Sequence, residues 1–216
     1  CGVMNENIYN QRLDYTKNDP LEPEALPNNP FELFHGWYKV ALAKIERDPN
    51  AMILSTVSNG QPRGRVVLLK NLDEKGFTYF TNYSSDKVKE TEQVANASLT
   101  FFWRDLERQV RVEGVVEKVT DKESDDYFMN RPLGSRLGAW ASPQSSEIAN
   151  REELIKNVEQ LKIDFEGKEV VRPKNWGGLR LVPTYFEFWQ GAPSRLHDRI
   201  VFQLEEGVWK KKRLAP

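Results

Sequence analysis

The sequence predicts a mainly β protein with peripheral helices (α+β), in which the strands form an antiparallel barrel or sandwich. Between residues 51 and 119, apolar segments rich in Val, Thr and aromatic residues follow one another closely and are separated by turn residues. Strands this closely spaced are typical of antiparallel barrels and sandwiches. Strand-like segments return after residue 178, and they have to pair with the earlier sheet. We therefore expect a single domain over residues 30–216.

The strands are predicted from apolar runs, alternation and turn residues. Ser58-Asn59-Gly60 is a hairpin signal after the first strand. A later strand alternates through Val110, Val112 and Val116. We expect strands at residues 51–57, 65–70, 76–81, 97–103, 107–119, 178–182, 185–190, 199–204 and 208–212.

The first helix is predicted to begin after Asn29, because Asn is a preferred capping residue and Pro30 suits the first turn. His35 is interpreted as a structural histidine beside the buried face of this helix. Residues 1–29 are polar, contain three prolines and are predicted to be an irregular arm. At helical spacing, the buried face is expected to hold Phe31, Phe34, Tyr38, Ala41 and Ile45.

Three further helices are predicted. A short one covers residues 85–94. Thr120 to Glu123 form a capping box for the next, which should end near Pro132. Asn150 begins the last, with Gly167 as its stop signal. One face of that helix carries Leu154, Val158, Leu161 and Phe165.

Composition excludes several classes of function. The net charge of −1 over 216 residues gives no reason to expect nucleic acid or an anionic membrane as a partner. The single cysteine, Cys1, excludes an internal disulfide framework and a cysteine-based zinc site. No apolar run approaches the roughly 20 residues of a membrane span, and no signal peptide is visible. We expect a cytoplasmic protein.

Arg65 and Lys70 stand at the two ends of the apolar run Val66 to Leu69. They indicate either a site for an anion such as a phosphate or two cations that emerge into solvent. An unpaired buried charge is costly, which favours either a ligand or exposure. Because the two positions differ by an odd number, a regular strand would point them to opposite faces.

Tyr127, Arg131 and Ser135 are spaced by four residues, so a helix would place the first two on one side. A phenol, a guanidinium and a hydroxyl together suit a phosphate ester. Two other polar segments are ambiguous. The alternating charges of residues 107–113 fit a solvated strand face, and residues 140–146 fit either a ligand loop or a plain Ser-rich loop.

Arg195, His197 and Arg199 lie within five residues and could grip an anion or move protons; a salt-bridged turn is the alternative. The sequence has no nucleophile elbow, no cluster with metal-ligand spacing and no glycine-rich phosphate loop. A nucleotide would therefore have to be bound by side chains.

In combination, ten stretches of the chain resemble the pyridoxine/pyridoxamine 5′-phosphate oxidase family. They run in order across nearly the whole sequence, and the set is highly specific although no single motif is. The stretches are Arg12 to Thr16, Arg65 to Lys70, Phe80 to Asn82, Glu107 to Val110, Tyr127 to Pro132, Leu137 to Ser146, Trp176 to Gly178, Phe188 to Gly191, Arg195 to Arg199 and Arg213 to Pro216.

The resemblance implies an FMN-binding split β-barrel of antiparallel strands that forms a homodimer, with FMN at the subunit interface. It implies oxidation of phosphorylated B6 vitamers to pyridoxal 5′-phosphate by O2, with release of H2O2. The arm of residues 1–29 would close over the active site. FMN binding is implied for Arg65, Val66, Val67, Leu68, Lys70, Phe80, Thr81, Lys87, Gln109, Gln144, Ser145, Trp189 and Arg199. Substrate binding is implied for Arg12, Tyr15, Lys70, Tyr127, Arg131, Ser135, Arg195 and His197, the last two also being catalytic.

One position departs from the family pattern. Asp86 stands where the family usually has an arginine that helps to hold the FMN phosphate. This departure predicts weaker FMN binding, or compensation by Lys89 or another cation. The alternatives are a non-catalytic FMN or pyridoxal-phosphate binding protein and a split-barrel flavin reductase.

Overall fold

The structure is a computed structural model that describes residues 13–216, and it contains two compact units. Unit 1 comprises residues 13–49, 102–110 and 186–216 of the described chain, and unit 2 comprises residues 50–101 and 111–185. Three strands continue from one unit into the other: β5 (Asn96–Trp103), β6 (Arg108–Lys118) and β7 (Trp176–Gln190). The expectation of a single domain over residues 30–216 stays a prediction.

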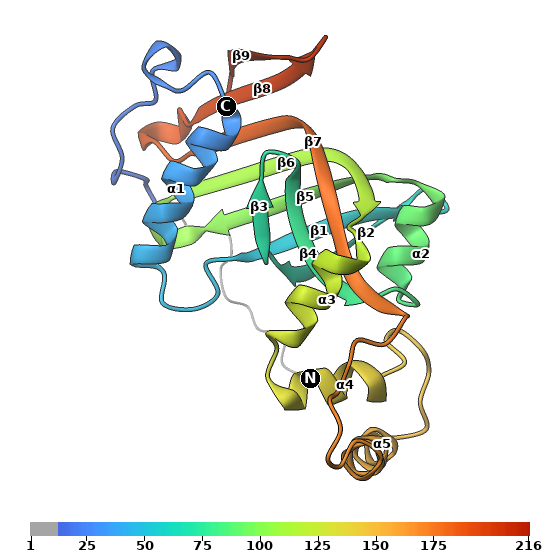
Figure 1. Ribbon diagram of the computed structural model, residues 1–216. Coiled ribbons are helices and arrows are strands. Elements are labelled where there is room, and N and C mark those ends of the chain that lie inside the picture. Colours follow the sequence, from blue (N-terminus) through green and yellow to red (C-terminus); the bar gives the residue numbers. More distant parts are fainter. Residues whose placement is uncertain (1–12) are drawn as a thin grey trace, which may run out of the picture. The chain divides into compact units, whose positions relative to one another are not determined.

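Unit 2 is built on an antiparallel sheet (Figure 1). Its hydrogen-bonded order is β2-β1-β5-β6-β7-β4-β3. The strands not yet placed are β1 (Ala51–Ser58), β2 (Gln61–Leu68), β3 (Asn71–Asp73) and β4 (Gly76–Asn82). Asn59 and Gly60 turn between β1 and β2 at φ 49° and 78°, and Ser58 pairs with Gln61. The predicted hairpin is confirmed, since both turn residues adopt the positive φ that a two-residue loop of this type requires.

Two residues carry the chain from one end of this sheet to the other. Leu69 N still donates to Asn50 O beside β1, at 2.9 Å. The next residue, Lys70, donates from its N to Thr78 O of β4, also at 2.9 Å. The end of β2 and the start of β3 are thus joined across the open side of the sheet, which curls it into a split barrel.

The segments predicted as two strands at 178–182 and 185–190 form the single strand β7, so the predicted break between them is wrong. The two residues left out of the predicted strands, Pro183 and Thr184, both belong to β7. The ladder between β4 and β7 ends at the pair Phe77–Leu181, so Pro183 lies beyond it and removes no bond from that ladder. On β6, Gly114 lies so close to Val182 and Pro183 that a side chain there would meet their backbone.

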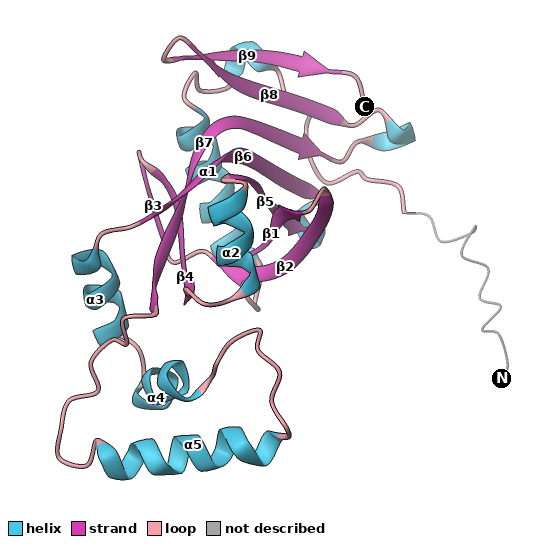
Figure 2. Cartoon of the chain, turned by 90° about the vertical axis from the view of Figure 1, so that its right-hand side faces the viewer, coloured by secondary structure: helices cyan, strands magenta, loops and turns pink. Residues whose placement is uncertain are grey.

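Unit 2 also contains the helices α2 (Asp86–Gln93), α3 (Asp121–Met129), α4 (Leu133–Ala141) and α5 (Arg151–Asp164). The predicted capping box at Thr120 is confirmed, and the Asn150 side chain accepts from Glu153 N at 3.0 Å. Both views show α5 beside α4 (Figures 1 and 2), where Trp140 and Phe165 lie 5.5 Å apart. The predicted face of α5 is half-buried.

Helix α4 was not predicted, because Pro132 was interpreted only as the end of the preceding helix. Pro132 also begins α4: its carbonyl accepts from Ser135 N at 2.9 Å and from Arg136 N at 3.1 Å. The chain therefore turns a corner at Pro132 instead of entering a loop. Residues 140–146 were expected to form a loop. Trp140 and Ala141 instead belong to α4, and the loop begins after them.

Unit 1 consists of α1 (Pro30–Lys44), the hairpin of β8 (Asp198–Glu205) and β9 (Val208–Leu214), and the ends of the shared strands, with β8 paired to β7. The Asn29 cap is confirmed, since its side chain accepts from Phe31 N. His35 is exposed. The buried side of α1 is rotated from the predicted one, because Trp37 packs against Phe188 with ring centroids 5.3 Å apart. Its buried members are Pro30, Leu33, Phe34, Trp37 and Ala41, while Phe31, Tyr38 and Ile45 are half-buried.

The described part of the N-terminal arm, residues 13–29, contains only the short 3-10 turn Pro23–Ala25 and packs against other segments of unit 1. Lys17 N donates to Glu107 Oε2 at 3.1 Å, and Leu21 N donates to Asp198 Oδ2 at 3.0 Å. Asp198 also pairs with Arg213, so this carboxylate orients a neighbouring arginine. Within residues 13–216, no helix has the length and apolar composition that crossing a membrane requires.

We expect Gly114→Ala to lower the free energy of unfolding by about 1–3 kcal/mol, the usual cost of overpacking. The new methyl group would meet the Val182 carbonyl carbon at 2.8 Å and Pro183 Cα at 2.9 Å. Urea unfolding followed by circular dichroism measures the change. Gly36→Ala in α1 is the control: nothing lies within 4 Å of its Cβ position, so we expect a gain of about 0.4–1 kcal/mol. Equal stabilities for the two variants would contradict this account.

Candidate active site

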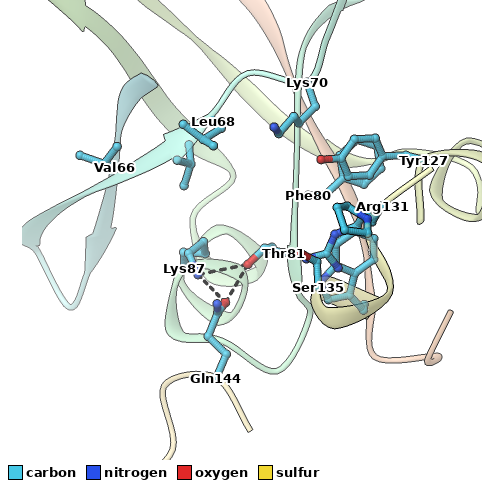
Figure 3. A pocket seen from close by; sticks show the side chains of 13 residues that line it. Val66, Leu68, Lys70, Phe80, Thr81, Lys87, Tyr127, Arg131, Ser135 and Gln144 are labelled. Carbon is cyan, nitrogen blue, oxygen red and sulfur yellow. Dashed lines mark hydrogen bonds between the residues drawn. The ribbon is translucent and has the colours of Figure 1, made fainter. Parts of the chain in front are cut away.

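A pocket of about 430 Å³ opens in unit 2 where the end of β2 faces β4 and the corner between α3 and α4 (Figure 3). Its walls come from β2, β4, β7, α2, α3, α4 and the loop after α4. It brings together eleven residues to which the family resemblance assigned a role in binding FMN or substrate. Two further lining residues had no assigned role. The lining residues are Val66, Val67, Leu68, Lys70, Phe80, Thr81, Lys87, Tyr127, Arg131, Pro132, Ser135, Gln144 and Trp176.

The two lining residues that sequence reasoning missed are Pro132 and Trp176. Trp176 belongs to the Trp-Gly-Gly stretch that marked the family resemblance, so a signal was present but no role was attached to it. Pro132 lies between Arg131 and the first residue of α4. As an N-cap it sets the direction in which α4 carries Ser135 toward the pocket.

Lys87 forms one polar corner of the pocket (Figure 3). Its Nζ donates to Gln144 Oε1 at 2.8 Å and to Thr81 Oγ1 and Ser85 Oγ at 3.1 Å each. All three acceptors are neutral. Burial and the nearby charge of Arg65 lower the pKa of Lys87, while Asp86 and Glu90 act in the opposite direction. This corner therefore presents a positive charge that an anionic group would stabilise.

Arg131 forms the second polar corner, on an aromatic floor. Phe80 and Tyr127 stack with centroids 3.9 Å apart, and Trp176 lies parallel to both rings. The Arg131 guanidinium lies 4.6 Å from the Trp176 ring centroid, and burial lowers its pKa. Its Nη1 is buried and has no hydrogen-bond partner among residues 13–216. A buried donor without a partner is costly, so this atom indicates a ligand that accepts a hydrogen bond.

The wall opposite the aromatic floor is apolar and ends in a cation (Figure 3). It consists of Val66, Val67 and Leu68 at the end of β2, followed by Lys70. Lys70 lies two residues beyond the end of β2, so strand alternation does not govern its direction. This resolves the geometric difficulty that the spacing of Arg65 and Lys70 raised.

Arg65 does not line the pocket, although the resemblance assigned it to FMN. Its Nη2 pairs with Glu90 Oε2 at 2.7 Å, and its Nη1 bonds to Thr56 and lies 3.4 Å from Leu54 O. Ser145 also does not line the pocket. It is exposed and has a positive φ of 68°. Asp86, the departure from the family pattern, is exposed in the first turn of α2.

The remaining described residues of the predicted site belong to unit 1, where Tyr15, Trp189 and His197 form a cluster. The His197 ring lies 4.8 Å from Trp189 and 5.6 Å from Tyr15 between centroids. His197 Nδ1 accepts from Ala192 N at 3.1 Å. The neutral imidazole therefore carries its proton on Nε2 and can donate from that atom. Arg12 lies outside the described residues.

Two arginines near this cluster differ in their surroundings. Arg195 is exposed and, like Ser194, has a positive φ, at 64° and 55°. Such conformations cost of order 1–3 kcal/mol each and concentrate at functional sites. Arg199 instead contacts Glu187 through two nitrogens, at 3.2 and 3.0 Å. Gln109 is half-buried on β6. No group of His, Cys, Asp or Glu within residues 13–216 could hold a metal ion.

Comparison with known proteins identifies the family. Residues 39–163 match the family model described as pyridoxamine 5′-phosphate oxidase. The chain belongs to this family. Residues 176–216 match the pyridoxine 5′-phosphate oxidase C-terminal dimerisation region, which supports a homodimer. Both the predicted resemblance and the predicted fold class are confirmed, and family membership makes the protein an FMN-dependent oxidoreductase.

Relatives cover the whole chain. The pyridoxine/pyridoxamine 5′-phosphate oxidase of Pseudomonas paraeruginosa is 50% identical, over 99% of this chain and 100% of that protein. The enzyme of the same name from Microcystis aeruginosa is 49% identical over the same shares. Among solved structures, PhzG from Burkholderia lata, in complex with tetrahydrophenazine-1-carboxylic acid, has a TM-score of 0.85 at 29% identity, covering 92% of this chain and 98% of that one. An FMN-binding protein from Nostoc punctiforme shares the fold, with a TM-score of 0.68 at 16% identity, covering 88% and 100%.

The residues of the pocket fit FMN. The cofactor combines a phosphate with a flat ring system, and the pocket combines a cation held only by neutral oxygens with apolar and aromatic walls. The unpartnered Arg131 Nη1 adds a second place for an anion. The pocket thus offers two separate cationic corners, Lys87 and Arg131, from different helices.

The lowered pKa of Lys87 predicts how FMN binding depends on pH. As pH rises, Lys87 should lose its proton below the ordinary lysine pKa of about 10.4, and affinity for the phosphate should fall with it. Lys87→Arg keeps the charge at every accessible pH and should remove this fall. Flavin fluorescence titrations between pH 7 and pH 10 measure the affinity. Lys89→Arg, an exposed neighbour on the same helix, should keep the wild-type profile. An unchanged alkaline fall in Lys87→Arg would exclude Lys87 as its cause.

Proposed function

We propose that the protein oxidises pyridoxine 5′-phosphate and pyridoxamine 5′-phosphate to pyridoxal 5′-phosphate, with FMN as cofactor and O2 as the final acceptor. One structural observation carries the proposal: a single pocket holds Lys70, Lys87 and Arg131, and none of them forms an ion pair within residues 13–216. Two phosphorylated molecules, cofactor and substrate, need two separate cationic corners. The full-length identity of about 50% to enzymes of this name supports the same assignment.

Bound FMN supplies two-electron oxidation with O2 as the acceptor, which no side chain of this chain provides. We propose that Lys87, Thr81 and Gln144 hold the phosphate of FMN. Their three side chains already form one hydrogen-bonded cluster, so little reorganisation is needed when the phosphate replaces bonds inside it. The remaining FMN contacts are proposed for Arg65, Val66, Val67, Leu68, Lys70, Phe80, Gln109, Ser145, Trp189 and Arg199.

The substrate phosphate is proposed to bind at Arg131, with Lys70, Tyr127 and Ser135. A planar guanidinium binds a phosphate bidentately, and hydroxyls add neutral hydrogen bonds. The aromatic floor under Arg131 fixes the guanidinium plane before the ligand arrives. Binding energy at the phosphate then orients the substrate, and the oxidation at C4′ becomes an effectively unimolecular step.

Arg195 and His197 are proposed to contact the pyridine ring of the substrate. His197 can donate from Nε2 because Nδ1 is occupied by Ala192 N. Arg195 is exposed on a strained turn and carries a permanent charge that can stabilise negative charge on the ring. Tyr15 and Arg12 are proposed to cover the bound ligand and exclude water. In the homodimer, FMN is proposed to lie at the subunit interface, and the protein is proposed to be cytoplasmic.

Purification followed by a single assay tests the proposal. The protein should be yellow, or become yellow with FMN, and should release H2O2 and form an aldehyde when pyridoxamine 5′-phosphate is added in air. A protein that binds flavin but forms neither product would favour a non-catalytic binding protein. A protein that cannot be loaded with FMN would contradict the whole proposal.

We expect Arg131→Met to raise KM for pyridoxine 5′-phosphate by about 10- to 100-fold, because a charge-assisted hydrogen bond contributes about 1.5–3 kcal/mol. FMN affinity should stay within about twofold, since Lys87 holds the other corner. Steady-state kinetics at saturating FMN measures KM, and unphosphorylated pyridoxine is the control substrate, whose turnover should not change. An equal loss with both substrates would exclude Arg131 as a phosphate ligand.

A further inference from the structure

Glu90 is a buried carboxylate next to the pocket that the proposed chemistry does not use. Its side chain is 4% exposed. It accepts from Thr56 Oγ1 at 2.5 Å, from Arg65 Nη2 at 2.7 Å and from Arg63 Nη1 at 2.9 Å. Burial alone would raise the pKa of Glu90, but these hydrogen bonds and the charge of Arg65 lower it. A carboxylate of α2 is thus bound by side chains of both β1 and β2.

Other contacts attach α2 only weakly. The helix has eight residues, and its buried residues are Val88, Glu90 and Thr91, of which only Val88 is apolar. Thr91 Oγ1 bonds back to Lys87 O and Val88 O within the same helix. The Ser85 side chain makes no capping bond. A helix this short is marginal without tertiary contacts. Apart from the bond of Lys87 to Thr81, the bonds of Glu90 are therefore the main buried polar tie between α2 and the sheet.

Glu92 provides a second tie of a different kind. It pairs with Lys118 of β6 at 2.9 Å, but the two side chains are 55% and 51% exposed. An exposed pair of this type contributes little, because water and salt screen it. Glu90 and Glu92 therefore offer a matched comparison: two carboxylates of one short helix, one buried and one exposed.

The position of α2 matters because the helix carries Lys87. Residues three apart lie on the same side of a helix, so Glu90 and Lys87 are neighbours one turn apart. Lys87 Nζ reaches Gln144 and Thr81 only while α2 keeps its place on the sheet. Glu90 also holds Arg65, the residue that directly precedes the apolar wall of the pocket.

We propose that Glu90 is a positioning residue that sets the affinity of the pocket for the phosphate of FMN. It docks α2 on β1 and β2 and thereby keeps Lys87 in the cluster with Thr81 and Gln144. The inference rests on the proposed function, because FMN is the ligand that this cluster holds. Glu90 itself is not among the residues that line the pocket.

The test compares FMN affinity in the full chain after bound flavin has been removed, by titration with FMN and quenching of flavin fluorescence. Glu90→Gln should raise Kd for FMN at least tenfold, while Glu92→Gln should stay within twofold of wild type. At saturating FMN, KM for pyridoxine 5′-phosphate should stay within twofold in both variants. This split separates the FMN corner from the substrate corner.

A double-mutant cycle with Lys87→Met shows whether Glu90 acts through Lys87. In that background, Glu90→Gln should raise Kd by less than twofold. Unchanged affinity of Glu90→Gln, or the same tenfold loss in both backgrounds, would overturn the inference. Wild-type protein that binds no FMN would instead overturn the proposed function, and the ligand named here with it.

Arg63→Gln keeps the inference testable if Glu90→Gln does not fold, as judged by circular dichroism. The Arg63 side chain is 49% exposed, so its loss leaves Glu90 still bound by Arg65 and Thr56. We expect a two- to fivefold rise in Kd for FMN and a wild-type KM for substrate. A Kd equal to that of wild type in folded Arg63→Gln would overturn the inference.

Discussion

The crossing of the chain between Leu69 and Lys70 is the constraint on which the pocket depends. The backbone N–H of Leu69 donates to Asn50 O beside β1, and that of Lys70 donates to Thr78 O of β4. Because backbone hydrogen bonds must be satisfied, these two residues have almost no freedom. The crossing brings the last residues of β2 opposite Phe80 and Thr81 of β4. It also frees Lys70 from strand alternation, so that an apolar wall and a cation follow each other directly.

The pocket shows how a site can be prepared for anions without an ion inside it. Lys87 donates to three neutral oxygens, and Arg131 lies on an aromatic ring with one buried nitrogen unpartnered within the described chain. Burial lowers the pKa of both groups, because a low-dielectric environment disfavours charge. A carboxylate paired with Lys87 or Arg131 would offset the free-energy cost of burying the positive charge. It would also occupy the cation and so remove the affinity for phosphate. Arg65 differs from both corners, because it already forms an ion pair with Glu90 at 2.7 Å.

Local signals in the sequence predicted most of the elements, because caps and turns depend on a few neighbouring residues. The Thr120 capping box and the Asn59-Gly60 turn are examples. The errors came from residues whose meaning depends on tertiary contacts. The predicted break at residues 183–184 is absent from β7, because the ladder with β4 ends at Leu181 and Pro183 removes no bond from it. Pro132 ends one helix and begins another. From the residues alone, two separate patterns indicated a phosphate site, and only the family resemblance joined them to Lys87 and Gln144. The ion pair between Arg65 and Glu90 was not predicted, because it joins a strand to a helix that no local pattern connects.

Asp86 illustrates how a departure from a family pattern depends on its place in the fold. It lies in the first turn of α2, where the partial positive charge of a helix N-terminus favours a carboxylate. It is exposed and is not among the residues that line the pocket. Its charge raises the pKa of Lys87 and so opposes the effect of burial and of Arg65. Asp86 therefore favours the protonated state of the lysine that the phosphate needs, although it also contributes some repulsion toward the phosphate. Water screens an exposed charge more than a buried one. Asp86 therefore stabilises the helix N-terminus and the protonated form of Lys87, while its repulsion of the phosphate is small.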